Sequence, residues 1–178
     1  RPIEDLTAVL TEIKGYNSNL HLCCLMTYSM LLRPHREIRC LRFSDFKNDF
    51  SILSLNGNRV KSKRNRIVPV PEAVKQELAS RFGTVDDREA NIFSLQPHEH
   101  NNSYFKGLWS KYKKRSTLLT HNHTLYSFRH TGAIKVFEKT GSLQKLQQVM
   151  GHSDMKVSLT YLRGLEVKQL DVEDLPEL

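Results

Sequence analysis

The segment QQVMGHSDMKVSLTYLRGL, residues 147–165, spaces a histidine and a tyrosine in a way that could serve catalysis. Gly151 predicts the end of one helix, and a new helix is predicted after His152, with Tyr161 nine residues beyond that histidine. A tyrosine hydroxyl can act as a nucleophile, and a histidine near a helix N-terminus can help hold the anion it attacks. The simpler interpretation is a packing corner between two helices.

A second segment, LLRPHREIRCLRFSDF, sets Arg33 at the end of a predicted buried helix, just before the bend at Pro34. From a rigid base an arginine can point its planar donors at a phosphate, since those donors match two oxygens at once. The alternative is a surface arginine that pairs with Glu37 or Asp45.

A third segment, RVKSKRNR, covers residues 59–66, and five of its eight residues are basic. A hairpin with this charge suits insertion into a DNA groove, and one lysine at its base could donate a proton if its pKa were lowered. The alternative is a solvated run of charge. This segment and a second basic run in residues 111–115 supply the candidate DNA contacts, which are Arg59, Lys63, Arg64, Arg66, Lys111, Lys113, Lys114 and Arg115.

A fourth segment, HNHTLYSFRHTG, places Arg129 in the apolar start of a predicted helix, with Tyr126 one turn before it on the same face. His121, His123 and His130 lie close together in this stretch. No cysteine or acidic residue accompanies them, so we predict no metal site here.

Composition agrees with a soluble globular domain that binds an anion. The 178 residues suffice for one domain with a substantial core, and 27 Lys and Arg against 19 Asp and Glu give a net charge of +8. Such a charge favours nucleic acid as the partner. Three cysteines, two of them adjacent and none in a CxxC pair, indicate a reducing cytosol and core packing. No apolar run is long enough to span a bilayer.

Hydrophobic periodicity predicts a mainly α (α+β) fold, a helical domain with a small antiparallel three-stranded β-sheet. Two or three short strands are expected between residues 50 and 70, around a turn at residues 56–58. Gly83 is the expected stop of the helix that follows. Helices are expected over residues 2–17, 19–32, 36–43, 71–82, 103–115, 127–139 and 142–150.

Taken in order, these motifs resemble the catalytic domain of the tyrosine recombinase (phage integrase) family. That family carries an arginine before a leucine and an aspartate, a hairpin lysine written K-x-x-K-x-R-x-V-P, a box H-x-x-R-H, and a Gly-His pair nine residues before a tyrosine. The chain shows RPHREIRCLRFSDF, KSKRNRIVP, YSFRHT, Gly151-His152 and Tyr161. LRPHREIR and YSFRHTGA most resemble integrases of bacterial mobile elements.

The resemblance implies a site-specific DNA recombinase in which Tyr161 attacks the scissile phosphate and forms a 3′-phosphotyrosyl bond. It implies supporting roles for a set of residues that balance charge, donate a proton to the leaving 5′-oxygen, or hold the phosphate and assist proton transfer: Arg33, Lys61, Tyr126, Arg129 and His152. It implies no metal and no nucleotide cofactor. Related alternatives are a relaxing topoisomerase of type IB and an inactive DNA-binding module.

Two departures from the family pattern leave alternatives open. Tyr126 stands where the box usually begins with histidine, and His123 is the other candidate for that role. Arg33 precedes Glu37 by four residues where the family has three, so Arg36 remains the second choice for the first arginine.

The resemblance also implies double-stranded DNA as partner, a tetramer on paired DNA sites, a free monomer, and accessory DNA-bending proteins. The expected location is the bacterial cytoplasm at the nucleoid, with no membrane attachment. Since the sequence opens on RPIEDL, we expect residues 1–178 to be the catalytic domain of a longer protein that has an N-terminal DNA-binding domain.

Overall fold

The computed structural model describes residues 1–59, 65–152, 155–162 and 165 of the chain. Helices make up 55% of it, which confirms the predicted mainly α class. The helices are α1 (Leu6–Tyr16), α2 (Ser18–Ser29), α3 (Glu72–Val85), α4 (Tyr104–Lys113), α5 (Leu125–Thr140), α6 (Leu143–Met150) and α7 (Met155–Thr160). Short 3-10 turns cover Ile38–Cys40, Phe43–Asp45 and Gly57–Arg59. None of the helices in these ranges is long and apolar enough to cross a membrane.

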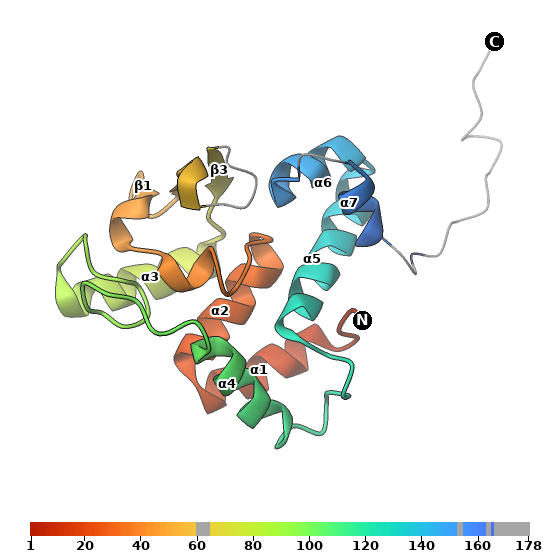
Figure 1. The fold of residues 1–178 in the computed structure, drawn as a ribbon, viewed down its shortest axis with the longest axis horizontal. Coiled ribbons are helices and arrows are strands. Elements are labelled where there is room, and N and C mark those ends of the chain that lie inside the picture. Colours follow the sequence, from red (N-terminus) through yellow and green to blue (C-terminus); the bar gives the residue numbers. More distant parts are fainter. Residues whose placement is uncertain (60–64, 153–154, 163–164, 166–178) are drawn as a thin grey trace, which may run out of the picture.

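Helix α2 forms the centre of the molecule because it is apolar on nearly every side. It contacts α1, α3, α4 and α5, as Figure 1 shows. Its side chains at Leu20, Leu22, Cys23, Cys24 and Met26 are fully buried. The aromatic residues of α4 pack into the same core, with Phe105, Trp109 and Tyr112 buried, as the helical spacing predicts.

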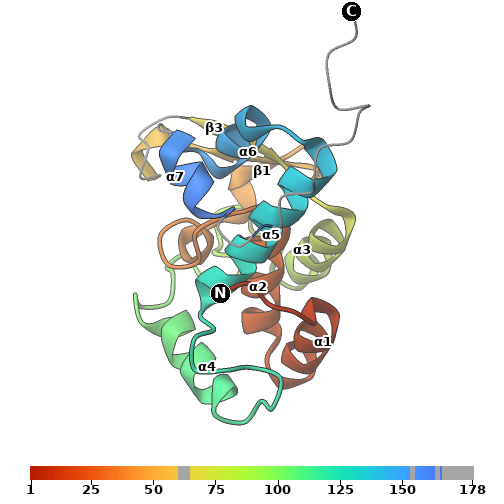
Figure 2. The same ribbon diagram turned by 90° about the vertical axis from the view of Figure 1, so that its right-hand side faces the viewer.

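The sheet is small, antiparallel and three-stranded, in the order β1 (Phe46–Lys47), β2 (Ile52–Leu55) and β3 (Arg66–Pro69). Leu53 pairs with both Phe46 and Val68, and these side chains face the core. Figures 1 and 2 place the sheet and helices α6 and α7 at the same end of the molecule. The sheet's last strand therefore begins near the segment that follows α6.

Several predicted boundaries differ from the structure. The helix expected over residues 36–43 is replaced by the two 3-10 turns Ile38–Cys40 and Phe43–Asp45, and the first strand, β1, lies before residue 50. Helix α3 continues through Gly83 to Val85, because Val85 packs against the core, and the left-handed residue that ends it is Asp86 with φ 47°. Helix α2 ends at Ser29, so Arg33 lies in a turn after the helix. Tyr161 directly follows α7, whose last residue is Thr160.

Helix α5 approaches the end of α2 at Gly132. A Cβ atom at this position would overlap the carbonyl oxygen of Tyr28 and lie 2.6 Å from Cδ2 of Leu31. A second apolar cluster of Leu31, Ala133, Leu146 and Met150 joins this crossing to α6. The distance between α2 and α5 is therefore set by the absence of a side chain at one residue, a single turn after Arg129.

We predict that Gly132→Ala lowers the free energy of unfolding by about 1–3 kcal/mol, because the added methyl group forces two packed backbones apart. Gly107→Ala is the matched control, since that glycine is exposed within α4 and a Cβ atom added there would meet nothing within 4 Å. The control gains helix propensity and is expected to be more stable by up to about 1 kcal/mol. Urea unfolding measures both. A Gly132→Ala variant as stable as the wild type would contradict the close approach.

Candidate active site

Arg33 is held by the carboxylate of Glu37. Oε2 of Glu37 accepts the backbone N–H of Arg33 at 2.8 Å, and Oε1 accepts from its Nη1 at 3.0 Å. The Arg33 carbonyl in turn accepts the N–H groups of Glu37 and Ile38. The Glu37 side chain is fully buried and that of Arg33 is 12% exposed. The sequence alone suggested a surface ion pair between Arg33 and Glu37. In the structure this pair is buried, and it stabilises the turn that follows α2.

Arg66, at the start of β3, reaches the same carboxylate. Its Nη2 donates to Oε2 of Glu37 at 3.2 Å, and its Nη1 donates to the carbonyl of Met150 at 3.0 Å. Its side chain is 8% exposed. Both ends of the Arg66 guanidinium are therefore used inside the protein, and its predicted role as a DNA contact stays a prediction.

Gly151 provides the space for this contact. It has φ 65°, a left-handed conformation that favours glycine, and a Cβ atom there would overlap Nη1 of Arg66. Gly151 thus ends α6, as predicted, and also admits the Arg66 side chain to the Met150 carbonyl.

Arg129 completes the cluster from α5. Its side chain is fully buried, with Nε donating to the Leu31 carbonyl at 2.9 Å and Nη2 donating to the Met150 carbonyl at 2.9 Å. The Met150 carbonyl accepts from both Arg66 and Arg129. We call Arg33, Glu37, Arg66, Arg129 and the Met150 carbonyl the arginine network. It joins the turn after α2 to β3, α5 and α6.

The arginine network carries more positive than negative charge. The network holds three guanidinium groups and one carboxylate, which pairs with two of them, Arg33 and Arg66. Burial lowers the pKa of Arg129 to about 10, so the group stays protonated at neutral pH. Guanidinium donors on rigid supports with an excess of positive charge suit a phosphate or similar anion.

His152 and Tyr161 lie against this network in the same chain. The guanidinium carbon of Arg129 lies 5.5 Å from the centre of the Tyr161 ring, within range of a cation–π contact. The centres of the His152 and Tyr161 rings are 5.6 Å apart, and the His130 ring meets Tyr161 edge-on at 6.1 Å. Nδ1 of His152 lies 3.0 Å from Oγ of Ser158. The predicted pairing of His152 and Tyr161 is thus present as a contact.

The geometry favours Tyr126 over His123 as the residue that takes the place of the usual histidine of the H-x-x-R-H box. Tyr126 is 38% exposed, and burial raises the pKa of its phenol while the charges of Arg129 and Arg33 lower it. A protonated hydroxyl next to the arginine network can donate a hydrogen bond. His123 is buried, with Nδ1 accepting the Thr120 N–H at 3.0 Å and Nε2 lying 3.2 Å from the Pro2 carbonyl.

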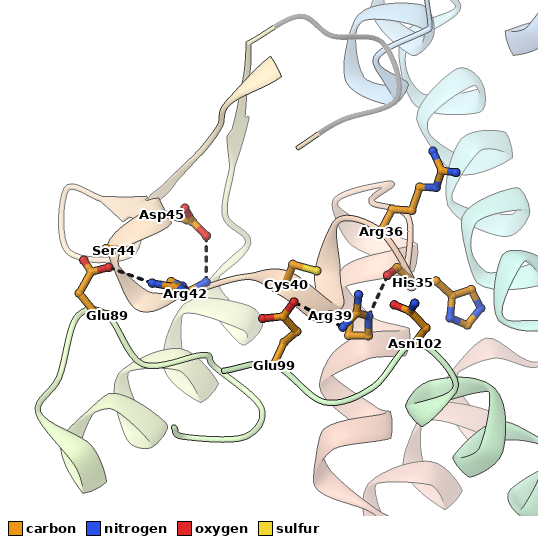
Figure 3. A pocket seen from close by; sticks show the side chains of 10 residues that line it. All are labelled: His35, Arg36, Arg39, Cys40, Arg42, Ser44, Asp45, Glu89, Glu99 and Asn102. Carbon is orange, nitrogen blue, oxygen red and sulfur yellow. Dashed lines mark hydrogen bonds and ion pairs between the residues drawn. The ribbon is translucent and has the colours of Figure 1, made fainter. Parts of the chain in front are cut away.

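The geometry also favours Arg33 over Arg36 as the first arginine of the family pattern. Arg36 is exposed and lines a cavity of about 710 Å³ to which no member of the arginine network contributes. Figure 3 shows the lining residues, which are His35, Arg36, Arg39, Cys40, Arg42, Ser44, Asp45, Glu89, Glu99 and Asn102. Arg39 pairs with Glu99 and Arg42 with Glu89 across it, whereas Arg36 extends away from these pairs toward α5.

The remaining predicted DNA contacts fall in two places. Lys61, Lys63, Arg64 and the side chain of Arg59 lie outside the described residues. The basic residues at the end of α4 lie at the opposite end of the molecule from α6, as Figures 1 and 2 show. Lys111 and Lys114 are exposed, Lys113 donates to the carbonyls of His121 and His123, and Arg115 lies over the ring of Tyr16. The α4 group is therefore separate from the arginine network.

The family of the chain follows from comparison with known proteins. The family model described as the phage integrase family matches residues 3–168. The chain therefore belongs to the phage integrase family.

Two curated relatives illustrate the similarity. Tyrosine recombinase XerA of Thermococcus onnurineus is 26% identical over 98% of this chain and 64% of its own length. A tyrosine recombinase of Pseudothermotoga lettingae is 27% identical over 91% of this chain and 55% of its own length. The chain thus spans less than two thirds of the length of either relative.

Solved structures share the fold. A crystal structure of XerA recombinase has a TM-score of 0.72 at 19% identity and covers 98% of this chain and 60% of that one. A lambda integrase dimer bound to a COC′ core site has a TM-score of 0.73 at 15% identity, covering 97% and 62%. The Tn1549 transposon integrase in complex with a circular intermediate DNA has a TM-score of 0.69 at 19% identity, covering 90% and 60%.

We predict that His152 makes the fold sensitive to acid. Burial, followed by the charges of Arg129, Arg33 and Arg66, lowers the pKa of His152 from 6.5 to about 4. Between these values the unfolded chain binds the proton and the folded chain does not, so the free energy of unfolding falls as the pH falls through this window. The melting temperature of His152→Gln should therefore drop less than that of the wild type between pH 6.5 and 4.5.

His98→Gln is the control for this measurement, because His98 is exposed and is not a member of the arginine network. Its acid sensitivity should match that of the wild type. An unchanged acid loss in His152→Gln would contradict the low pKa of His152.

Proposed function

We propose that this chain is the catalytic domain of a site-specific DNA recombinase that cleaves and rejoins strands through a 3′-phosphotyrosyl intermediate. The observation that carries the proposal is the contact of Tyr161 with Arg129 and His152 at the edge of a positively charged network. A tyrosine placed for packing alone does not require a buried arginine and two histidine rings around it. Membership of the phage integrase family supports the same reaction.

In the proposed reaction the Tyr161 hydroxyl loses its proton to solvent water as its oxygen attacks the scissile phosphorus. The new ester bond forms as the bond to the 5′-oxygen breaks, and Lys61 gives a proton to that oxygen. The freed 5′-hydroxyl of a partner strand then attacks the phosphotyrosine and releases Tyr161. The ester retains the energy of the broken bond, so the proposal uses no metal and no nucleotide cofactor.

Arg33 and Arg129 would stabilise the charge that grows on the phosphate oxygens in the transition state. Donors aimed at such charge in advance are worth several kcal/mol of barrier, on the order of a hundredfold to a thousandfold in rate for one donor. The buried partners of both arginines, Glu37 and two backbone carbonyls, support this role because they fix the guanidinium planes before the DNA arrives. His152 and Tyr126 would add neutral hydrogen bonds to the phosphate.

The proposed partner is double-stranded DNA, with four protomers assembled on paired sites and accessory DNA-bending proteins aiding the assembly. The DNA complexes of the lambda and Tn1549 integrases support a DNA partner, and the transposon integrase supports a mobile element as the source. The greater length of the relatives supports a longer parent protein, and we propose that its further part includes a DNA-binding domain. We place its action at the bacterial nucleoid in the cytoplasm.

Tyr161→Phe tests the proposal directly. Nicked duplexes with a randomised core serve as substrates that trap the covalent intermediate, and a denaturing gel separates the protein-DNA adduct. The wild type should form adduct, and Tyr161→Phe should form none while it keeps its melting temperature and DNA binding, because no other group replaces the nucleophile.

Tyr16→Phe is the control, since Tyr16 lies beneath Arg115 at the far end of the molecule and loses only a hydroxyl. It should form adduct at the wild-type rate. Normal adduct yield from Tyr161→Phe would refute the function.

A further inference from the structure

Ser158 joins the two groups of the segment that first suggested catalysis. It lies on α7, between His152 before the helix and Tyr161 after it. Its Oγ is 3.0 Å from Nδ1 of His152. One hydrogen bond therefore ties the turn after α6 to the helix that leads into Tyr161.

The burial of Ser158 is unusual for its helix. It is fully buried, whereas Met155, Val157 and Leu159 around it are exposed. A buried hydroxyl is costly unless it is hydrogen-bonded, and alanine would fill the same space with a better helix propensity. The position thus places a hydroxyl group where packing alone favours a methyl group, and the hydroxyl faces the ring of His152.

A neutral imidazole carries one N–H, on either Nδ1 or Nε2, and the partner of one nitrogen decides the state of the other. Burial and the nearby arginines lower the pKa of His152, so its ring is neutral at pH 7. A serine hydroxyl can rotate to donate or to accept. If it donates to Nδ1, then Nε2 carries the proton and acts as a donor.

The charges around His152 decide between these states. The groups that act on it are Arg129, Arg33, Arg66 and Glu37. An anion held by the arginines offers only acceptor oxygens. The lone pair of an unprotonated Nε2 would repel these oxygens, whereas an N–H group at Nε2 would donate a hydrogen bond to one of them. The arrangement therefore favours a proton on Nε2 and a hydroxyl of Ser158 that donates to Nδ1.

We propose that Ser158 is a positioning residue that holds the proton of His152 on Nε2, so that His152 donates a hydrogen bond to the scissile phosphate only while α7 is docked. The presence of the phosphate rests on the proposed function. The proposal adds that the state of His152 and the placement of Tyr161 are coupled, because the same helix provides Ser158 and leads into the nucleophile.

The tautomer can be read without DNA, with inorganic phosphate present as the anion. In ¹⁵N-histidine-labelled protein at pH 7, two-bond proton–nitrogen spectra distinguish protonated from bare ring nitrogens, and His152→Gln assigns the signals. The wild type should show a bare Nδ1 and a protonated Nε2. Ser158→Ala should shift His152 toward a mixture of both tautomers, and Ser158→Thr should restore the wild-type pattern. A proton on Nδ1 in the wild type, or an unchanged spectrum in Ser158→Ala, would overturn the proposal.

Single-turnover adduct formation supplies the second measurement. Loss of one neutral hydrogen bond should slow Ser158→Ala by about tenfold, with Ser158→Thr near the wild-type rate. Equal rates in Ser158→Ala and the wild type would also overturn the proposal. The predicted spectra, together with a wild type that forms no adduct, would support the tautomer assignment and refute the recombinase function alone.

Discussion

The buried carboxylate of Glu37 is the interaction on which the site depends. It accepts from the backbone and guanidinium of Arg33 and from the guanidinium of Arg66, and it is fully shielded from solvent. A charge in such a place is tolerated only when it is paired and hydrogen-bonded, and removal of one partner leaves the others uncompensated. The turn after α2 and the start of β3 are therefore fixed relative to each other by one side chain.

The same contacts extend to the rest of the site through the Met150 carbonyl. Arg66 and Arg129 both donate to it, so the end of α6 is held at a fixed distance from β3 and α5. Gly151 and His152 directly follow Met150 in the chain, so the contacts that fix the Met150 carbonyl also determine where these two residues lie. The structural network and the proposed anion site thus share the same arginines. The excess positive charge weakens the network, and a bound phosphate would neutralise it.

Local signals in the sequence predicted much of this fold. The end of α6 at Gly151 and the aromatic core face of α4 follow from contacts within a few residues, and the structure has both of them. The burial of Arg66 could not be predicted in this way, since its partners Glu37 and Met150 lie 29 and 84 residues away in sequence. A basic run predicts exposure, and only the folded chain shows that its last member turns inward.

The end of helix α3 near Gly83 shows the same limit of prediction from local sequence. Glycine is a common helix stop, but packing of Val85 against the core favours continuation by two residues. Likewise, the spacing of Arg33 and Glu37 predicted an ion pair, while its burial depends on Arg66 from a distant strand. Tertiary contacts decide which local alternatives are realised.

The central claim is that the Glu37 carboxylate orients Arg33, the arginine that we propose acts directly on the phosphate. The most direct test is the single-turnover rate of adduct formation by Glu37→Gln, with Glu89→Gln as the control because Glu89 pairs with Arg42 in an exposed position. Rates are compared on the folded fraction of each variant. We expect Glu37→Gln to slow adduct formation by at least about a hundredfold, as for the loss of one preorganised donor, and Glu89→Gln to match the wild type. A wild-type rate in folded Glu37→Gln would contradict the account.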